Sequence, residues 1–314
     1  MNTVENFDLY APRLVDKEEY FAAGHRACSG CGEALAIRLM CKALGEDTVI
    51  VNATGCMEVV SVMYPTTAWN LPWIHVAFPN AASVGSGVEA ALKVLRRKGK
   101  IADRRIKVVA IGGDGGTFDI GFQALSGAME RGHDLLYVCF DNEAYMNTGI
   151  QRSGLTPIYA ATTTTPVASE SRGKKSNKKN VPFIMAAHNI PYVATASVAY
   201  PNDLIGKLQY AKTIKGFKYL HVQSPCPTGW GFDPARTIKV ARLMVESGMW
   251  PLYEINEGNF KLTYKPRELK PVREALSLQG RFRHLDDSEY EYIQGRAVEH
   301  WRQLLDVDGK KLPL

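Results

Sequence analysis

The sequence predicts an α/β fold, a mostly parallel sheet with helices on both faces. Short apolar segments such as 48–52 (TVIVN) and 106–112 (IKVVAIG) are typical of strands that are buried on both sides. They alternate along the chain with longer segments of helical periodicity, which is the order of a parallel βαβ sheet. The 314 residues are enough for one large α/β domain or two smaller ones.

Each expected element has a local signal in the sequence. The expected strands are the apolar segments 48–52, 106–112, 134–140, 192–198 and 217–223. Four expected helices end at or near a glycine, and they span 33–43, 84–98, 118–131 and 201–215, of which the last begins with proline. A fifth helix is expected at about 288–305. Residues 151–182 lack apolar periodicity, so we expect a long functional or mobile loop there. We interpret 1–235 as the main domain and 236–314 as a helical or irregular C-terminal arm that packs on it or on partner subunits.

Composition excludes several classes of protein. Hydrophobic residues make up 46% and charged residues 22%, which are ordinary globular values. No run approaches about 18 apolar residues, so no membrane span is expected. The N-terminal sequence MNTVENFDLYAPRLVDKEEY is too polar for a secretory signal. We therefore expect a cytoplasmic protein whose six cysteines are free thiols or metal ligands.

The net charge of +6 is modest, and we expect no nucleic-acid partner. The one dense basic stretch is 172–179 (RGKKSNKK). It is either a solvated loop or a contact for an acidic partner or for ligand phosphates.

A glycine-rich acidic loop, IGGDGG, follows the 106–112 strand directly. Asn142 follows the next expected strand, and parallel strands bring their carboxyl ends to the same edge of a sheet. Asp114 and Asn142 should therefore face one cavity. Gly113 and Gly115 would let the backbone approach a diphosphate. Two side-chain oxygens and a nearby backbone carbonyl would suit Mg²⁺.

Four of the six cysteines could meet at this edge. They are Cys28 and Cys31 in CSGC, Cys56 after the 48–52 strand, and Cys226 after the 217–223 strand. Four thiolates could hold a [4Fe–4S] cluster. Their spacing alone also permits a zinc site, a redox pair or incidental thiols. Cys41 and Cys139 fit core packing instead.

Five separated motifs together resemble the β subunit of the 2-oxoacid:ferredoxin oxidoreductases. The motifs are GHRACSGCGE (24–33), NATGC (52–56), GGDGG (112–116), FDNEAYMNTGIQRS (140–153) and HVQSPCPTGW (221–230). The resemblance covers most of residues 20–285. It is greatest to the pyruvate branch, within which the oxalate-oxidising relative is our best match.

The resemblance implies thiamine diphosphate, Mg²⁺ and one [4Fe–4S] cluster. It assigns Asp114, the Asn142 side chain and the Ala144 carbonyl to Mg²⁺, and Asn147 to a catalytic place beside the thiazolium ring and the substrate. Cys28, Cys31, Cys56 and Cys226 match the cluster ligands, and Glu33, Gly115 and Thr148 are further candidates for cofactor contact. Where the general thiamine motif has Asn-Asn, this chain has Asp141-Asn142.

The resemblance also implies a partner. The Glu that activates thiamine lies in a pyrimidine-binding domain that we do not find in this sequence, so another subunit should supply it, with further iron–sulfur clusters. We expect oxidative decarboxylation of oxalate, or alternatively of pyruvate with coenzyme A, with electrons passing to ferredoxin. A non-catalytic electron-transfer subunit is the alternative from another class. Arg152 is a possible contact for the anionic substrate, and His25 is more consistent with a packing role.

Overall fold

The computed structural model describes residues 17–313. Residues 1–16, which make up most of the segment judged too polar for a secretory signal, lie outside the described residues. Within the described range, no helix is both long and apolar enough to cross a membrane.

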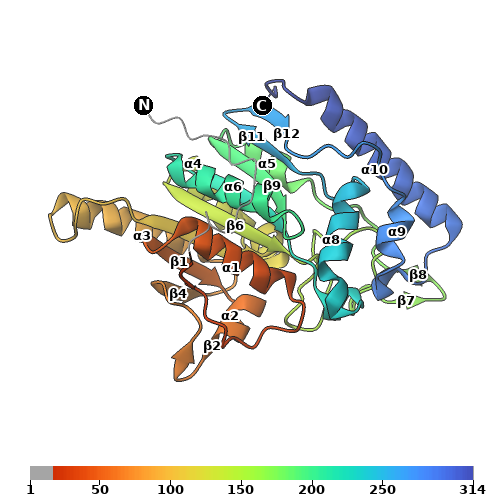
Figure 1. The fold of residues 1–314 in the computed structure, drawn as a ribbon, viewed down its shortest axis with the longest axis horizontal. Helices are drawn as coiled ribbons and strands as arrows, with labels where there is room; N and C mark the ends of the chain where they lie inside the picture. The colour runs from red at the N-terminus through yellow and green to blue at the C-terminus, as the bar shows by residue number, and fades with distance from the viewer. Residues whose placement is uncertain (1–16, 314) are drawn as a thin grey trace.

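A mostly parallel eight-stranded sheet forms the centre of the molecule (Figure 1). Its strands are β1 (Thr48–Ala53), β4 (Trp73–Val76), β5 (Lys107–Gly113), β6 (Leu135–Asp141), β9 (Tyr192–Ser197), β10 (Lys218–Gln223), β11 (Tyr253–Asn256) and β12 (Asn259–Leu262). They are ordered β12-β11-β9-β10-β6-β5-β1-β4. All neighbouring pairs from β9 to β4 are parallel, and β11 and β12 are antiparallel additions at one edge. The predicted fold class is confirmed.

Helices cover both faces of the sheet. On the face toward the viewer in Figure 1, α1 (Gly32–Leu44) and α6 (Pro201–Thr213) bury apolar residues against the strands. On the opposite face lie α3 (Ala81–Arg97), α4 (Phe122–Glu130), α5 (Val181–Ala186) and α10 (Asp287–Val307). The core therefore consists of two layers, one on each side of the sheet.

The C-terminal part is joined to the main sheet. The expected boundary at residue 235 is not the end of the sheet, since β11 pairs with β9. The helices α8 (Thr237–Glu246), α9 (Val272–Leu276) and α10 share a separate apolar cluster around the buried residues Leu252 and Phe282.

Several short elements were not predicted. They are α2 (Cys56–Ser61), α5, α7 (Pro227–Trp230), α8, α9, the outer strands β4, β11 and β12, and the hairpins β2–β3 (Val62–Met63, Thr66–Thr67) and β7–β8 (Val167–Ala168, Ser171–Arg172). The segment expected as one helix over 118–131 is a π-helical turn, Gly116–Ile120, followed by α4.

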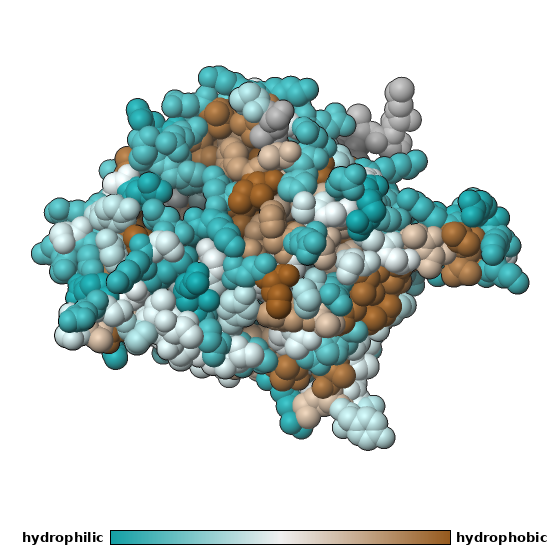
Figure 2. All heavy atoms as spheres, turned by 180° about the vertical axis from the view of Figure 1, so that it is seen from behind, coloured by the Kyte–Doolittle hydropathy of each residue, from teal (hydrophilic) through white to brown (hydrophobic). Residues whose placement is uncertain are grey.

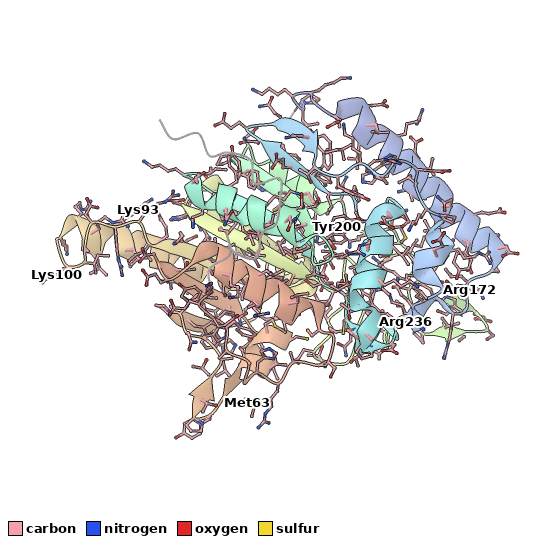
Figure 3. All side chains as sticks on the ribbon, in the orientation of Figure 1. Met63, Lys93, Lys100, Arg172, Tyr200 and Arg236 are labelled. Atoms are coloured by element: carbon pink, nitrogen blue, oxygen red, sulfur yellow. The ribbon has the colours of Figure 1, made fainter. Side chains whose placement is uncertain are left out.

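Two structures project from the body. One is the C-terminal end of α3 and the loop after it, marked by Lys93 and Lys100 in Figure 3, and the other is the β2–β3 hairpin with Met63. The rear view shows both projections standing clear of the surface, with a largely hydrophilic tip on the α3 side (Figure 2). Tyr64 at the hairpin turn is 99% exposed. Neither projection lines the cavity described next.

Candidate functional site

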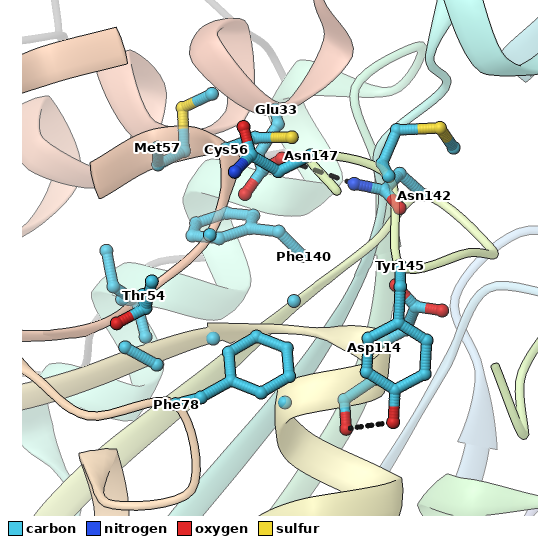
Figure 4. A pocket seen from close by; sticks show the side chains of 18 of the residues that line it. Glu33, Thr54, Cys56, Met57, Phe78, Asp114, Phe140, Asn142, Tyr145 and Asn147 are labelled. Carbon is cyan, nitrogen blue, oxygen red and sulfur yellow. Dashed lines mark hydrogen bonds between the residues drawn. The ribbon is translucent and has the colours of Figure 1, made fainter. Parts of the chain in front are cut away.

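A cavity of about 180 Å³ lies at the carboxyl ends of β1, β5 and β6. These strands are neighbours in the sheet, so the loops that follow them meet. Glu33, Cys56 and Asn147 gather at one end of the cavity, and Phe78 and Tyr145 lie at the other (Figure 4). All residues proposed from the sequence for cofactor or Mg²⁺ contact line it: Glu33, Gly113, Asp114, Gly115, Asn142, Ala144, Asn147 and Thr148. Asn147 and Thr148 are exposed and form part of the rim.

Three polar groups converge inside this cavity. One terminal atom of the Asn142 side-chain amide lies 3.2 Å from Asp114 Oδ1 and 2.8 Å from the Ala144 carbonyl oxygen, and the other lies 3.4 Å from Glu33 Oε2. With its nitrogen on the Asp114 side, the amide donates to both of these oxygens. With its oxygen there, the three oxygens need a cation between them. A carboxylate, an amide oxygen and a carbonyl are a hard donor set. The residues present therefore fit Mg²⁺.

The pKa values of two buried carboxyl groups here, Asp114 and Asp141, are shifted in opposite directions. Burial raises the pKa of Asp114 well above its usual range, and the Asp141 carboxylate adds to this. Burial would also raise the pKa of Asp141, but Lys178 and His221 outweigh it and hold that pKa at about 2. Ser153 Oγ donates to Asp114 Oδ2. A cation bound at Asp114 would favour its charged form.

The end of β5 and the loop after it require glycine, because neighbouring tyrosine side chains lie close to the backbone there. A Cβ on Gly115 would lie 2.5 Å from the Tyr145 ring, and a Cβ on Gly112 would lie 2.8 Å from Tyr137 Oη. Because Gly113, Gly115 and Gly116 have no side chains, their backbone borders the cavity directly. Such a loop at the start of a helix suits a diphosphate.

Glu33 brings a buried carboxyl group to the same cavity from α1. Burial raises its pKa to about 8, although the hydrogen bond from Asn142 opposes the shift. Glu33 can therefore hold a proton near neutral pH.

The four candidate cluster cysteines lie in loops or at the start of helices. Cys31 is the N-cap of α1, and Cys28 is exposed in the loop before that helix. Cys56 begins α2, and Cys226 is the N-cap of α7. The Gly32 amide donates to the Pro225 carbonyl at 3.1 Å, which joins the CSGC loop to the loop that carries Cys226. Cys56 also lines the cavity.

These thiols are close enough to affect one another. Burial, Glu33 and the other three cysteines all raise the pKa of Cys56. Burial and Glu33 raise the pKa of Cys31 to about 12. No group of three or more His, Cys, Asp or Glu side chains within residues 17–313 is arranged to hold a single metal ion. A four-iron cluster is bound by more widely spaced sulfurs than one ion is, so a cluster remains a proposal. Cys41 and Cys139 are buried in the two core layers.

Two further candidates, Arg152 and His25, do not line the cavity. Arg152 is exposed. His25 stacks on Phe21, with 4.9 Å between the ring centroids.

The basic stretch 172–179 is a solvated loop only in part, since Arg172, Lys175 and Lys179 are exposed whereas Lys174 is buried. Lys174 is buried and donates to the Gly154 and Thr156 carbonyls. Lys178 pairs with Asp141 at 2.7 Å. The stretch therefore neutralises and anchors groups within the chain.

Several site residues were not identified from the sequence. Asn52 lines the cavity at the end of β1, and a polar residue that ends an apolar strand was the available signal. Phe78 and Tyr145 form an aromatic wall, with 5.7 Å between their ring centroids, and no sequence signal marked them. The ion pairs of Glu143 with Lys178 and Arg281 also went unnoticed.

The model for the C-terminal TPP-binding domain of thiamine pyrophosphate enzymes matches residues 53–222. Pyruvate synthase subunit PorB of Methanocaldococcus jannaschii is 60% identical over 279 residues, covering 88% of this chain and 94% of that protein. The ketoisovalerate oxidoreductase subunit VorB of Pyrococcus abyssi is 47% identical over 289 residues, covering 91% and 93%.

A solved structure shares the fold. It is 2-oxoglutarate:ferredoxin oxidoreductase from Magnetococcus marinus with 2-oxoglutarate, coenzyme A and succinyl-CoA bound. The TM-score is 0.59 at 20% identity, and the match covers 93% of this chain and 99% of that one. At this identity the likeness concerns the fold alone.

Proposed function

The chain belongs to the thiamine pyrophosphate enzymes and, among them, to the β subunits of the 2-oxoacid:ferredoxin oxidoreductases, and from this premise we propose that it is the diphosphate-binding half of a pyruvate-oxidising active site. The other half, with the Glu that activates the cofactor, comes from another subunit. Electrons leave through a [4Fe–4S] cluster toward ferredoxin. The names of the similar proteins support pyruvate better than the oxalate that we first expected.

One observation carries this proposal. The Asp114 carboxylate, the Asn142 side-chain amide and the Ala144 carbonyl converge in the cavity that Cys56 also lines. A hard oxygen set and a soft sulfur ligand thus border one space, which suits a diphosphate-bound Mg²⁺ next to an electron acceptor.

Bound thiamine diphosphate would supply an electron sink for the decarboxylation. Asp114, Asn142 and Ala144 would hold its Mg²⁺, and Gly113 and Gly115 would give its diphosphate access to the backbone. Asn147 would donate a hydrogen bond to the oxygen on which charge develops, worth a few kcal/mol if preorganised. Glu33 would keep a proton on its carboxyl group inside the cavity. With pyruvate, coenzyme A accepts the acyl group, whereas oxalate would leave only CO₂.

The test uses the native complex. We expect purified complex to contain thiamine diphosphate, Mg²⁺, iron and sulfide, and its visible iron–sulfur absorbance to bleach when pyruvate and coenzyme A are added. Absence of thiamine diphosphate would leave only a non-catalytic electron-transfer subunit. Bleaching by oxalate without coenzyme A, and none by pyruvate, would instead support the oxalate assignment. 2-Ketoisovalerate serves as a third substrate in the same assay.

A further inference from the structure

The metal-binding loop contains a strained turn at Glu143. This residue lies between Asn142 and Ala144, and its φ of 66° is in the left-handed region, which is costly for residues other than glycine. The turn brings the end of the Asn142 side-chain amide to within 2.8 Å of the Ala144 carbonyl oxygen. Strain of this kind persists only where the surroundings hold it in place.

Two cations, the buried Arg281 and the half-buried Lys178, hold the Glu143 carboxylate, which is itself only 2% exposed. Arg281 Nη2 lies 2.5 Å from Oε2, and Lys178 Nζ lies 3.0 Å from Oε1. The Arg281 guanidinium also stacks on Trp230, 3.9 Å from the ring centroid. Thr156 Oγ1 donates to the Glu143 carbonyl at 2.6 Å. The side-chain carboxylate and the backbone carbonyl of Glu143 are thus both held in place.

Trp230 extends this arrangement to the preceding residue of the loop. Its Nε1 donates to the Asn142 carbonyl at 2.7 Å. Trp230 ends the short helix α7, which begins after Cys226. The Arg281 side chain therefore supports the turn in two ways, directly through Glu143 and indirectly through Trp230.

We propose that Glu143, clamped by Arg281 and Lys178, is a positioning residue that holds the left-handed turn and so aims the Asn142 and Ala144 oxygens at the metal ion. The inference rests on the proposed function, because it assumes a cation among these oxygens. It also gives the C-terminal segment a role in the site, since Arg281 lies beyond the domain boundary that we expected at residue 235.

The test measures metal binding without turnover. The native complex is stripped of thiamine diphosphate and metal, and Mn²⁺ binding in the presence of added thiamine diphosphate is followed by electron paramagnetic resonance. Mn²⁺ prefers the same oxygen ligands as Mg²⁺. We expect Arg281→Met to weaken Mn²⁺ binding about 10- to 100-fold, as is typical when a partner of a metal ligand is removed.

A double variant separates positioning from general stability. In Arg281→Met with Glu143→Gly, the glycine adopts positive φ without strain and no buried carboxylate is left unpaired. We expect the double variant to recover most of the lost Mn²⁺ affinity, even if its melting temperature stays low. If the complex with Arg281→Met does not assemble, Mn²⁺ binding is measured with Arg281→Lys instead. Lysine keeps the positive charge but lacks the planar guanidinium group.

The matched control is Lys207→Met, which removes a buried lysine paired with Asp203 at 2.7 Å on α6. It should lower stability and leave Mn²⁺ affinity unchanged. The proposal is overturned if the arginine variant binds Mn²⁺ as tightly as the unsubstituted complex, if the double variant binds no better than the single one, or if Lys207→Met weakens binding equally. If the unsubstituted complex itself shows no thiamine-dependent Mn²⁺ binding, the proposed function fails as well, so the two failures can be told apart.

Discussion

Asn52 is a buried amide that lines the cavity, and its Nδ2 has no hydrogen-bond partner among the described residues. A hydrogen bond to a charged acceptor is worth about 1.5–3 kcal/mol. If Asn52 donates to the bound cofactor, Asn52→Leu should weaken thiamine diphosphate binding roughly 10- to 100-fold. Calorimetric titration of the stripped complex measures this. The same change should not lower the melting temperature of the stripped complex, because it removes an unpaired polar group; unchanged cofactor affinity would show that Asn52 makes no such bond.

A second prediction for a single residue concerns Gly115, whose backbone lies close to the Tyr145 ring. Its backbone is in the ordinary right-handed region, with a φ of −65°, so alanine would meet a steric obstacle only. That obstacle is the Tyr145 ring, which donates from Oη to Asp119 at 3.0 Å and so resists displacement. We expect Gly115→Ala to lower the free energy of unfolding by about 1–3 kcal/mol, as overpacking does, and to weaken cofactor binding.

Thermal unfolding and cofactor titration check this, with Gly87→Ala as the matched control. An added Cβ on Gly87, within α3, meets nothing within 4 Å. The control should gain about 0.5–1 kcal/mol of stability and bind the cofactor normally. Equal behaviour of the two variants would contradict the steric argument.

At the scale of elements, the sequence predicted those that carry their own periodicity. The parallel strands other than β4, and the helices α1, α3, α6 and α10, lie within a few residues of their expected bounds, because long apolar segments closed by glycine are local signals. The strands β11 and β12 are four residues each, too short for a clear alternation.

Much of the candidate cavity was also foreseen, because parallel strands bring their carboxyl ends together. The ion pairs that hold the loop beside the cavity could not be predicted. Glu143 and Arg281 are 138 positions apart, and a buried pair at that separation leaves no mark in local composition. The loop at 151–182 was expected to be irregular, yet its lysines pair with buried groups that only the fold brings near.

Cys226 also has a structural role, because it is the N-cap of α7. Cys226 Sγ accepts from the Gly229 amide at 3.3 Å as the N-cap of α7. Serine is a preferred N-cap, so Cys226→Ser should keep α7 while it removes a proposed cluster ligand. We expect loss of the visible absorbance and of cluster iron, with little change in the melting temperature of the cluster-free protein.

The control for this prediction is Cys139→Ser, in the buried centre of β6. It should destabilise the fold, since it places a hydroxyl in the core, and leave the cluster signal intact. Equal loss of iron in the two variants would mean that the cysteines are wrongly assigned.

At the scale of the whole molecule, the chain carries the residues proposed to bind the metal ion and the cluster but only part of the enclosure around them. The described residues include the three groups that we propose for a metal ion and the four thiols that we propose for a cluster, while Asn147 and Thr148 are exposed at the rim. A catalytic site must exclude water from its reacting centre. Another subunit that covers this rim would both close the cavity and bring the activating Glu.

This division of labour predicts a separation of cluster binding from turnover. All four proposed cluster ligands come from this chain, so the chain purified alone, after anaerobic reconstitution with iron and sulfide, should show the visible absorbance of a cluster. It should not bleach with pyruvate, coenzyme A and thiamine diphosphate, because the ylide-forming Glu is absent. Addition of the partner subunits should restore bleaching within the same sample. Bleaching by the chain alone would place the activating group within it, and failure to form any cluster would mean that a ligand comes from the partner.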